Sequence, residues 1–232
     1  MLTDQIAFIQ IKPQSKRHHL FILVLGAVLL MFNFVLNAYF WQEYRLPLMV
    51  MMFACCILLF VGFSKYTEPN TSYRLTRENI HFIHRHGQWQ LPWIDVIRIG
   101  TLNTVVGNEY TQLPYLGIRL KSLDNIADSI SPRLANRLIH EQQELLVLAA
   151  HNKDVILENG LINFSPFQLN KKLYKGPIAG WLYRTEQLAS IYGYHLFLPI
   201  SGFDRELDEF LLLLNQCKNH AQVTVPPVND DF

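Results

Sequence analysis

The sequence of 232 residues has only three cysteines, which is too few for a framework of disulfide bonds. Cys55 and Cys56 lie inside an apolar run and Cys217 lies far from both, a usage that fits a reducing compartment. An excess of one charge is also lacking, because 20 basic residues stand against 19 acidic ones. Nucleic-acid binding usually needs a basic face, so we expect no nucleic-acid partner.

Motifs that carry enzyme chemistry are missing as well. The glycines are scattered, and neither GxxxxGK(S/T) nor GxGxxG is present to hold phosphates. His140 and Glu141 resemble half of a zinc-protease helix, but the second histidine four residues on is absent. His84 and His86 have the spacing of a metal pair on a strand, yet no Cys or carboxylate pattern lies nearby, which favours exposed turn histidines. We therefore expect no catalytic residues, no cofactor and no metal.

Two long apolar runs are the main feature that the sequence does have. They cover residues 20–40 and 46–63, and neither contains Asp, Glu, Lys or Arg. Each has the length that a helix needs to cross a hydrocarbon core of about 30 Å, and a helix that is apolar all round must be buried or in lipid. We expect a transmembrane hairpin over residues 20–63. A cleaved signal peptide is the competing interpretation, but its apolar region would be shorter, about 7–15 residues.

The charges around the hairpin predict its orientation. Only residues 41–45 connect the runs, so the helices must be antiparallel and both chain ends must lie on one side. The loop offers Arg45, offset by Glu43, whereas the other side carries six basic residues: Lys12, Lys16, Arg17, Lys65, Arg74 and Arg77. By the positive-inside rule we expect a multi-pass inner-membrane protein with both termini in the cytoplasm.

Two amides interrupt the first run. Asn33 and Asn37 are four residues apart and so share one face of a helix. Amides in hydrocarbon seek partners, which favours pairing of this face with the second helix or with another protomer. The alternative is that both amides lie near the interface and bind headgroups or backbone.

Short strands with turn signals follow the hairpin. Residues 73–76, 79–85, 88–91, 94–99, 102–106 and 116–121 are rich in β-formers, and Asn79 and Gly87 belong to the turns between them. Closely spaced antiparallel strands of this kind predict a meander that curls into a barrel or a sandwich.

The order of these segments resembles a known family. Residues 73–76 read Tyr-Arg-Leu-Thr, residues 91–96 read Leu-Pro-Trp-Ile-Asp-Val, and both follow directly on the hairpin. This order resembles the opening of bacterial pleckstrin-homology-like (PH-like) membrane proteins. The whole chain is also similar to a proteobacterial family of uncharacterised inner-membrane proteins. The PH-like resemblance implies an antiparallel β-barrel or sandwich that an amphipathic helix closes.

The second half of the chain contains helices. Ser131 and Pro132 begin one that reaches residue 150, and Pro177 begins another that Gly193 ends. Residues 194–200 predict a strand. Residues 205–218 predict the closing helix, whose apolar stripe comprises Leu207, Phe210, Leu211, Leu214 and Cys217. The two earlier helices are either insertions in one domain or parts of a second subdomain.

The predicted fold is therefore α+β, with four parts. A cytoplasmic N-terminal segment covers residues 1–19, the hairpin residues 20–63, a cytoplasmic PH-like domain with helical insertions residues 64–222, and a flexible tail residues 223–232. A split of the domain near residues 125–130 remains open.

One basic run is a candidate for contact with the membrane surface. Lys171, Lys172 and Lys175 are the densest cations of the chain and would attract anionic headgroups if they faced the bilayer. The alternative is a solvated turn before Gly176.

Two classes of function remain. We favour a membrane-anchored, non-catalytic binding or scaffold protein that presents a PH-like domain at the cytoplasmic membrane surface. Its partners would be the bilayer, and either a second copy or another protein. The alternative is a membrane-surface enzyme that acts on lipid or envelope precursors through an unrecognised site.

Overall fold

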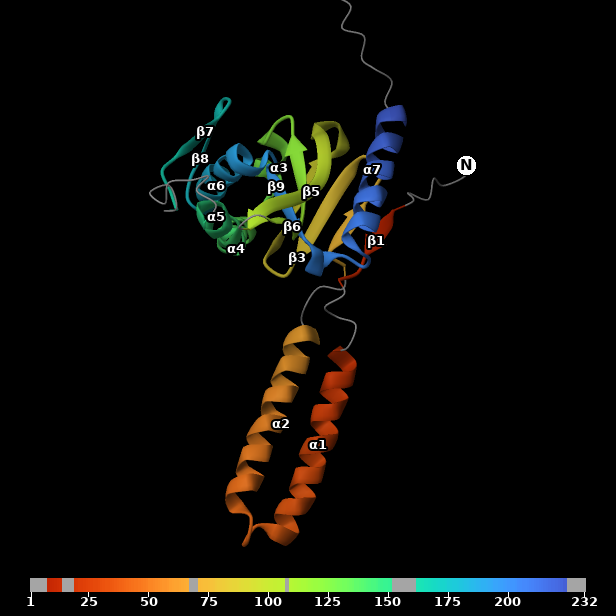
Figure 1. Ribbon diagram of the computed structural model, residues 1–232, viewed down its shortest axis with the longest axis vertical. Coiled ribbons are helices and arrows are strands. Elements are labelled where there is room, and N and C mark those ends of the chain that lie inside the picture. Colours follow the sequence, from red (N-terminus) through yellow and green to blue (C-terminus); the bar gives the residue numbers. More distant parts are fainter. Residues whose placement is uncertain (1–7, 14–18, 67–70, 107–108, 152–161, 225–232) are drawn as a thin grey trace, which may run out of the picture. The chain divides into compact units, whose positions relative to one another are not determined.

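The computed structural model describes residues 8–13, 19–66, 71–106, 109–151 and 162–224. The chain divides into two compact units, one of residues 13–70 and one that combines residues 1–12 with residues 71–232. Figure 1 shows the first unit as a helical hairpin and the second as a domain of helices and antiparallel strands. The prediction of a mixed α+β chain with two N-terminal helices is confirmed at this level.

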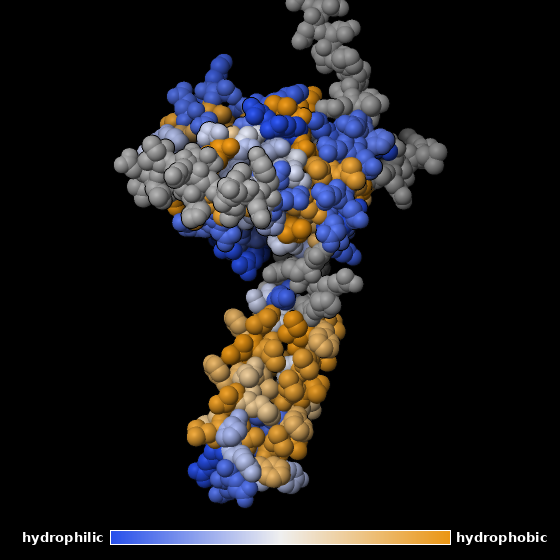
Figure 2. Space-filling model, in the orientation of Figure 1, coloured by the Kyte–Doolittle hydropathy of each residue, from blue (hydrophilic) through white to orange (hydrophobic). Residues whose placement is uncertain are grey.

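The hairpin consists of α1 (His19–Phe40) and α2 (Arg45–Tyr66), each of 22 residues. At 1.5 Å per residue each helix is about 33 Å long, and both are long and apolar enough to cross a membrane. Figure 2 shows apolar side chains over the visible face of the hairpin, with polar ones at its loop.

Two single glycines let these helices approach each other closely. A Cβ on Gly62 would lie 3.1 Å from the Cα of Leu23, and a Cβ on Gly26 would lie 3.1 Å from a methyl group of Leu59. Small residues at such crossings allow backbones to pack tightly without a GxxxG motif.

The first sheet of the domain has four antiparallel strands in the order β1-β2-β3-β4. Their bounds are β1 (Ile9–Ile11), β2 (Tyr73–Leu75), β3 (Asn79–His84) and β4 (Gly87–Pro92). The Thr76 hydroxyl fixes the turn after β2, because it accepts the N–H of Asn79 at 3.0 Å.

Strand β1 was not anticipated from the sequence. It precedes the hairpin in the chain, yet Ile11 is the register partner of Tyr73, which follows the hairpin. The Ile11 side chain is fully buried in the domain core. Part of the expected N-terminal segment thus belongs to the sheet, and the hairpin is inserted between two neighbouring strands.

The second sheet contains β5 (Val96–Val106), β6 (Glu109–Leu120) and β9 (Leu196–Pro199), in the order β5-β6-β9. The turn η2 (Trp93–Asp95) separates it from the first sheet. The sequence left a barrel or a sandwich open, and the strands that the structure describes form separate antiparallel sheets and no closed barrel. Pro92 ends β4 because it has no N–H to donate, and the chain then enters the second sheet.

A long insertion lies between β6 and β9. It comprises α3 (Asp124–Ser129), α4 (Pro132–Glu141), α5 (Gln143–His151), β7 (Phe167–Leu169), β8 (Lys172–Tyr174) and α6 (Pro177–Tyr192). The Ser131 hydroxyl caps α4 by accepting the N–H of Leu134, as its position before Pro132 predicts. The single helix expected over residues 131–150 is interrupted at Gln142.

The last described elements are η4 (Ile200–Gly202) and the closing helix α7 (Leu207–Thr224). Helix α7 packs against β5, β6 and η2. Phe210 and Leu214 are fully buried, and the Phe210 ring stacks on Phe203 with centroids 4.0 Å apart. The main core lies between the sheets and this helix, and a smaller cluster that includes Leu102, Leu145 and Leu188 joins β5 to the inserted helices.

Candidate functional site

A pocket of about 330 Å³ lies where β6 ends, next to the turn of the β7–β8 hairpin and the start of β9. Polar side chains with hydrogen-bond donors contribute much of its wall. The lining residues are Leu120, Lys121, Ser122, Leu123, Leu169, Asn170 and His195.

The backbone sets the protonation of His195. Its Nδ1 accepts the N–H of Leu120 at 3.1 Å, so the neutral ring carries its proton on Nε2. Burial lowers the pKa of His195, and the nearby positive charge of Arg119 lowers it further. At neutral pH the ring is therefore an uncharged donor through Nε2–H.

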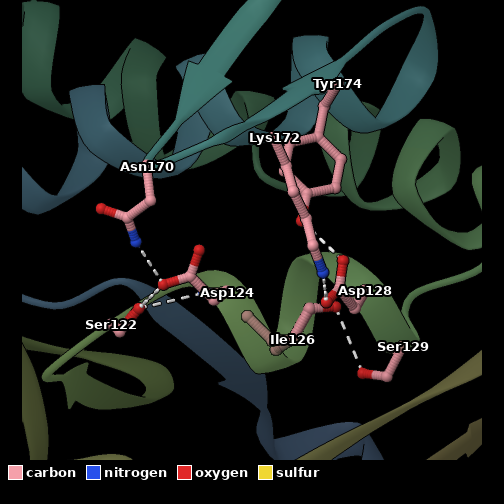
Figure 3. Close-up of polar contacts among 8 residues, drawn as sticks. All are labelled: Ser122, Asp124, Ile126, Asp128, Ser129, Asn170, Lys172 and Tyr174. Carbon is pink, nitrogen blue, oxygen red and sulfur yellow. Dashed lines mark hydrogen bonds and ion pairs between the residues drawn. The ribbon is translucent and has the colours of Figure 1, made fainter.

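The β7–β8 hairpin is fastened to α3 beside the pocket (Figure 3). At one end of α3, Asn170 donates through Nδ2 to Asp124 Oδ2 at 2.6 Å. At the other end, Asp128 accepts from the Lys172 ammonium and from the Tyr174 hydroxyl, the latter at 2.6 Å. We call these five side chains the α3 clasp.

The clasp also shifts two pKa values. The hydrogen bonds from Lys172 and Tyr174 lower the pKa of Asp128 below its usual range. Burial and the hydrogen bond to Asp128 raise the pKa of Tyr174. Asp128 is therefore an ionised carboxylate held by two donors, and the α3 clasp fixes the pocket wall that carries Asn170.

The geometry of the pocket suits binding better than nucleophilic catalysis. The Ser122 hydroxyl donates to Asp124 and accepts the N–H of Asp124 at 3.1 Å, so its hydrogen bonds stay within the turn. The His195 Nδ1, which a general base would need, is already bonded to the backbone. Lys121 and the Nε2–H of His195 remain as donors for a ligand that is rich in acceptors.

The three lysines of the basic run have different surroundings. Lys171 lies in the turn between β7 and β8 and Lys175 follows β8, and both are exposed. Lys172 belongs to the α3 clasp through its ion pair with Asp128. Their contact with a membrane surface stays a prediction, and one of the three charges already has a partner.

The two amides of α1 meet within the hairpin. Asn33 is buried, and its Nδ2 donates to the carbonyl oxygen of Leu48 on α2 at 3.2 Å. Asn37 donates to the Asn33 side chain at 2.8 Å and to its carbonyl at 2.9 Å. Within this unit the face that carries both amides is thus turned toward α2.

The other described histidines that the sequence offered as candidates lie in different surroundings. The rings of His84 and His86 have centroids 5.1 Å apart at the β3–β4 turn, and the exposed His140 lies in the last turn of α4. Among the residues that the structure describes, no group of three or more His, Cys, Asp or Glu side chains could hold a metal ion.

Sequence reasoning did not single out the pocket residues. Lys121, Asn170 and His195 come from three distant segments, and none belongs to a motif. The one local signal is Asn170, whose φ of 50° is left-handed and is typical of Asn in a tight turn.

Fold and pocket together define a chain with an apolar helical hairpin and an α+β domain that carries a donor-lined pocket. Residues 73–220 match the family described as Protein of unknown function (DUF2982), and the chain belongs to this family. The match runs from β2 into α7 and so covers most of the α+β domain. No curated protein and no solved structure matches the chain.

Proposed function

We propose that this protein is a membrane-anchored binding module, which presents a PH-like domain at the cytoplasmic surface of a bacterial inner membrane. The observation that carries the proposal is the pairing of β1 with β2 on either side of the hairpin. Two strands of one sheet must lie on the same side of a membrane, so the hairpin would enter and return.

Charge supports the cytoplasmic side. Lys12 precedes α1, and Lys65 lies in the last turn of α2. The loop between the helices has only Arg45 with Glu43 beside it. The side on which both strands lie is thus the more basic one, as the positive-inside rule requires of a cytoplasmic side.

The arrangement of the domain supports the PH-like part of the proposal. Two antiparallel sheets follow each other, and α7 packs on the second one as a closing helix would. Because β9 returns to pair with β6, the segment from α3 to α6 reads as an insertion in one domain over residues 64–222. The pocket at the base of this insertion offers the binding function a location.

Disulfide trapping in native membranes tests the carrying observation. Gln10 and Arg74 are register partners on β1 and β2, and both are exposed. In a chain whose three native cysteines are replaced by Ala, Gln10→Cys with Arg74→Cys should crosslink under mild oxidation. The matched control pairs Gln10→Cys with Gln90→Cys, which lies on β4 of the same sheet and should stay reduced.

Topology reporters complete the test. A reporter fused after residue 232 should be active only in its cytoplasmic form, and one inserted at Glu43 only in its exported form. The protein should also resist extraction from membranes at alkaline pH. Extraction into the soluble fraction, or a missing Gln10–Arg74 crosslink with reporters on opposite sides, would refute the proposal.

A further inference from the structure

Two arginines lie directly opposite each other on the second sheet, next to the pocket but outside it. Arg98 on β5 and Arg119 on β6 are register partners, so their side chains leave the same face of the sheet. Both residues are exposed. Like charges in directly opposed positions destabilise an antiparallel pair, so this arrangement calls for a compensating group.

The two guanidinium groups converge on one point. A Cβ built on Gly193 would lie 3.0 Å from Arg98 Nη2 and 3.9 Å from Arg119 Nη1, so these nitrogens are at most about 7 Å apart. Gly193 ends α6 with a left-handed φ of 75°, which a side chain would strain. Glycine at this position therefore allows the left-handed end of α6 and also leaves room for the Arg98 side chain.

Tyr194 and the backbone of Gly193 hold the pair in place. The Tyr194 ring covers the backbone of Gly100 and Gly117, where an added Cβ would lie 2.4 Å and 2.3 Å from Tyr194 atoms. The Arg98 guanidinium stacks on this ring at 4.8 Å from the centroid, and Arg119 Nη1 donates to the Gly193 carbonyl at 3.4 Å. Both cations are thus oriented by neutral groups before any ligand arrives.

No carboxylate neutralises the pair within the described part of the chain. The ion pairs found there join Arg137 to Glu141, Lys172 to Asp128, and Arg205 to Asp204. The charge of Arg119 also acts on its surroundings, since it is the second cause, after burial, of the lowered pKa of His195. Most of the five N–H donors on each guanidinium remain available.

We propose that Arg98 and Arg119 bind a phosphate group, with one guanidinium on each side of it. Charge-assisted N–H···O contacts of about 2.8 Å on both sides of a phosphate bridge a separation of this size. The planar forks of two arginines match the oxygens of a doubly charged phosphate better than two ammonium groups would. The phosphate belongs either to a lipid headgroup or to a small soluble compound.

This site is distinct from the donor-lined pocket, and phosphate binding does not depend on insertion of the hairpin into a membrane. It also differs from recognition by the first hairpin of the domain, where Glu78 lies between Arg77 and Arg85 in the sequence. Failure of the topology experiments would therefore leave the phosphate site untouched, and the reverse is also true.

Calorimetry on the full chain in neutral detergent micelles tests the proposal, with inorganic phosphate as the probe and chloride at matched ionic strength. Arg98→Gln and Arg119→Gln should each weaken phosphate binding about tenfold, because each removes charge-assisted contacts. The matched control is Arg133→Gln, which removes one exposed charge from α4 and should change the affinity less than about twofold. Arg98→Lys keeps the charge but loses the fork, so its affinity should be intermediate.

Two short-chain lipids distinguish the sources of the phosphate. If a headgroup is the ligand, dihexanoyl phosphatidic acid should bind more tightly than inorganic phosphate, and dihexanoyl phosphatidylcholine should not compete. If a soluble compound is the ligand, inorganic phosphate and phosphatidic acid should bind alike. In both cases the two Gln variants must lose the binding.

A melting experiment separates binding from a structural role. With a bound phosphate the thermal midpoint of the native chain should rise, and that rise should vanish in Arg98→Gln and Arg119→Gln. The proposal is refuted if phosphate binds no better than chloride, or if Arg133→Gln loses as much affinity as the pair variants. It is also refuted if phosphate raises the thermal midpoint of the pair variants as much as that of the native chain.

Discussion

The hairpin and the closing helix α7 are both rich in leucine and phenylalanine, but the two regions expose these residues differently. On α1 and α2 large apolar side chains point outward on most sides, for example Phe34 with 65% of its surface exposed. On α7 they form one stripe, so that Leu214 is fully buried while Leu212 is 63% exposed. A one-sided stripe is satisfied by a protein core, whereas an all-round apolar surface needs lipid or other protein.

The comparison also separates what holds each region together. Polar contacts and close glycine packing join α1 to α2, through Asn33 with Leu48 and through Gly62 with Leu23. Burial of apolar area holds α7 on the domain, since Phe210 and Leu214 contact the main core. In an apolar surrounding, burial of apolar side chains contributes little to the association of two helices, so close packing and hydrogen bonds must hold the helices together.

The largest effect is expected from truncation of the buried stripe of α7. Leu214→Ala should lower the free energy of unfolding of the domain by about 2–5 kcal/mol, since it leaves a cavity in the core. For a domain of this size that is a fall in thermal midpoint of roughly 5–15 °C. Calorimetry of the full chain measures it, and the exposed Leu212→Ala is the control. Equal shifts in both variants would mean that α7 does not bury its stripe.

A somewhat smaller effect is expected on β1, which ties the N-terminus to the domain. Ile11 is fully buried, whereas Ile9 on the same edge strand is 41% exposed. Ile11→Ala should destabilise the domain by about 2–3 kcal/mol and Ile9→Ala by well under 1 kcal/mol. Chemical unfolding followed by tryptophan fluorescence gives both values. If Ile11→Ala is silent, β1 does not contribute to the stability of the sheet.

Within the hairpin the expected effect is smaller still. Asn33→Ala removes the hydrogen bond to Leu48 on α2, and such bonds contribute roughly 0.6–1.7 kcal/mol between helices in membranes. Asn37→Ala removes contacts within α1 only, so it should cost less. Unfolding of the full chain by increasing SDS, followed by circular dichroism, ranks the two variants. The reverse ranking would assign helix pairing to Asn37.

The smallest effect concerns pH, to which the domain should respond through His195. Its folded-state pKa is lowered, so the unfolded chain binds the proton more readily and stability falls as the pH drops below the ordinary value of about 6.5. Denaturant midpoints at about pH 7.5 and 5.5 should differ less in His195→Gln than in the native chain. His140→Gln, at an exposed ring, should keep the native difference, and an unchanged difference in His195→Gln would contradict the assignment.

Local patterns predicted the elements that local forces determine. The helix around Phe210 and Leu214 follows from apolar spacing and an acidic first turn, and α4 follows from Ser131 before Pro132. The end of α6 follows from Gly193. These signals act within a few residues, so they can be recognised in a single sequence.

Contacts between distant residues could not be predicted in the same way. Ile11 pairs with Tyr73 although the whole hairpin lies between them in the sequence. A strand of three residues with no turn next to it carries no local pattern from which this pairing could be predicted. No Gly or Pro marks the break at Gln142. The pocket and the Arg98–Arg119 pair form only when β5, β6 and β9 lie side by side. No sequence motif predicts this arrangement of the three strands.

The pairing of β1 with β2 has a consequence for the order in which this protein is made. The ribosome releases Ile11 about sixty residues before its partner Tyr73, and at about 5–20 residues per second this delay lasts roughly 3–12 s. During that time α1 and α2 emerge, and with the proposed topology they would already be entering the bilayer. Strand β1 can then pair with β2 only after the chain that follows α2 has emerged on the side where β1 lies. With that topology, insertion of the hairpin would set the earliest time at which the sheet of the α+β domain can form.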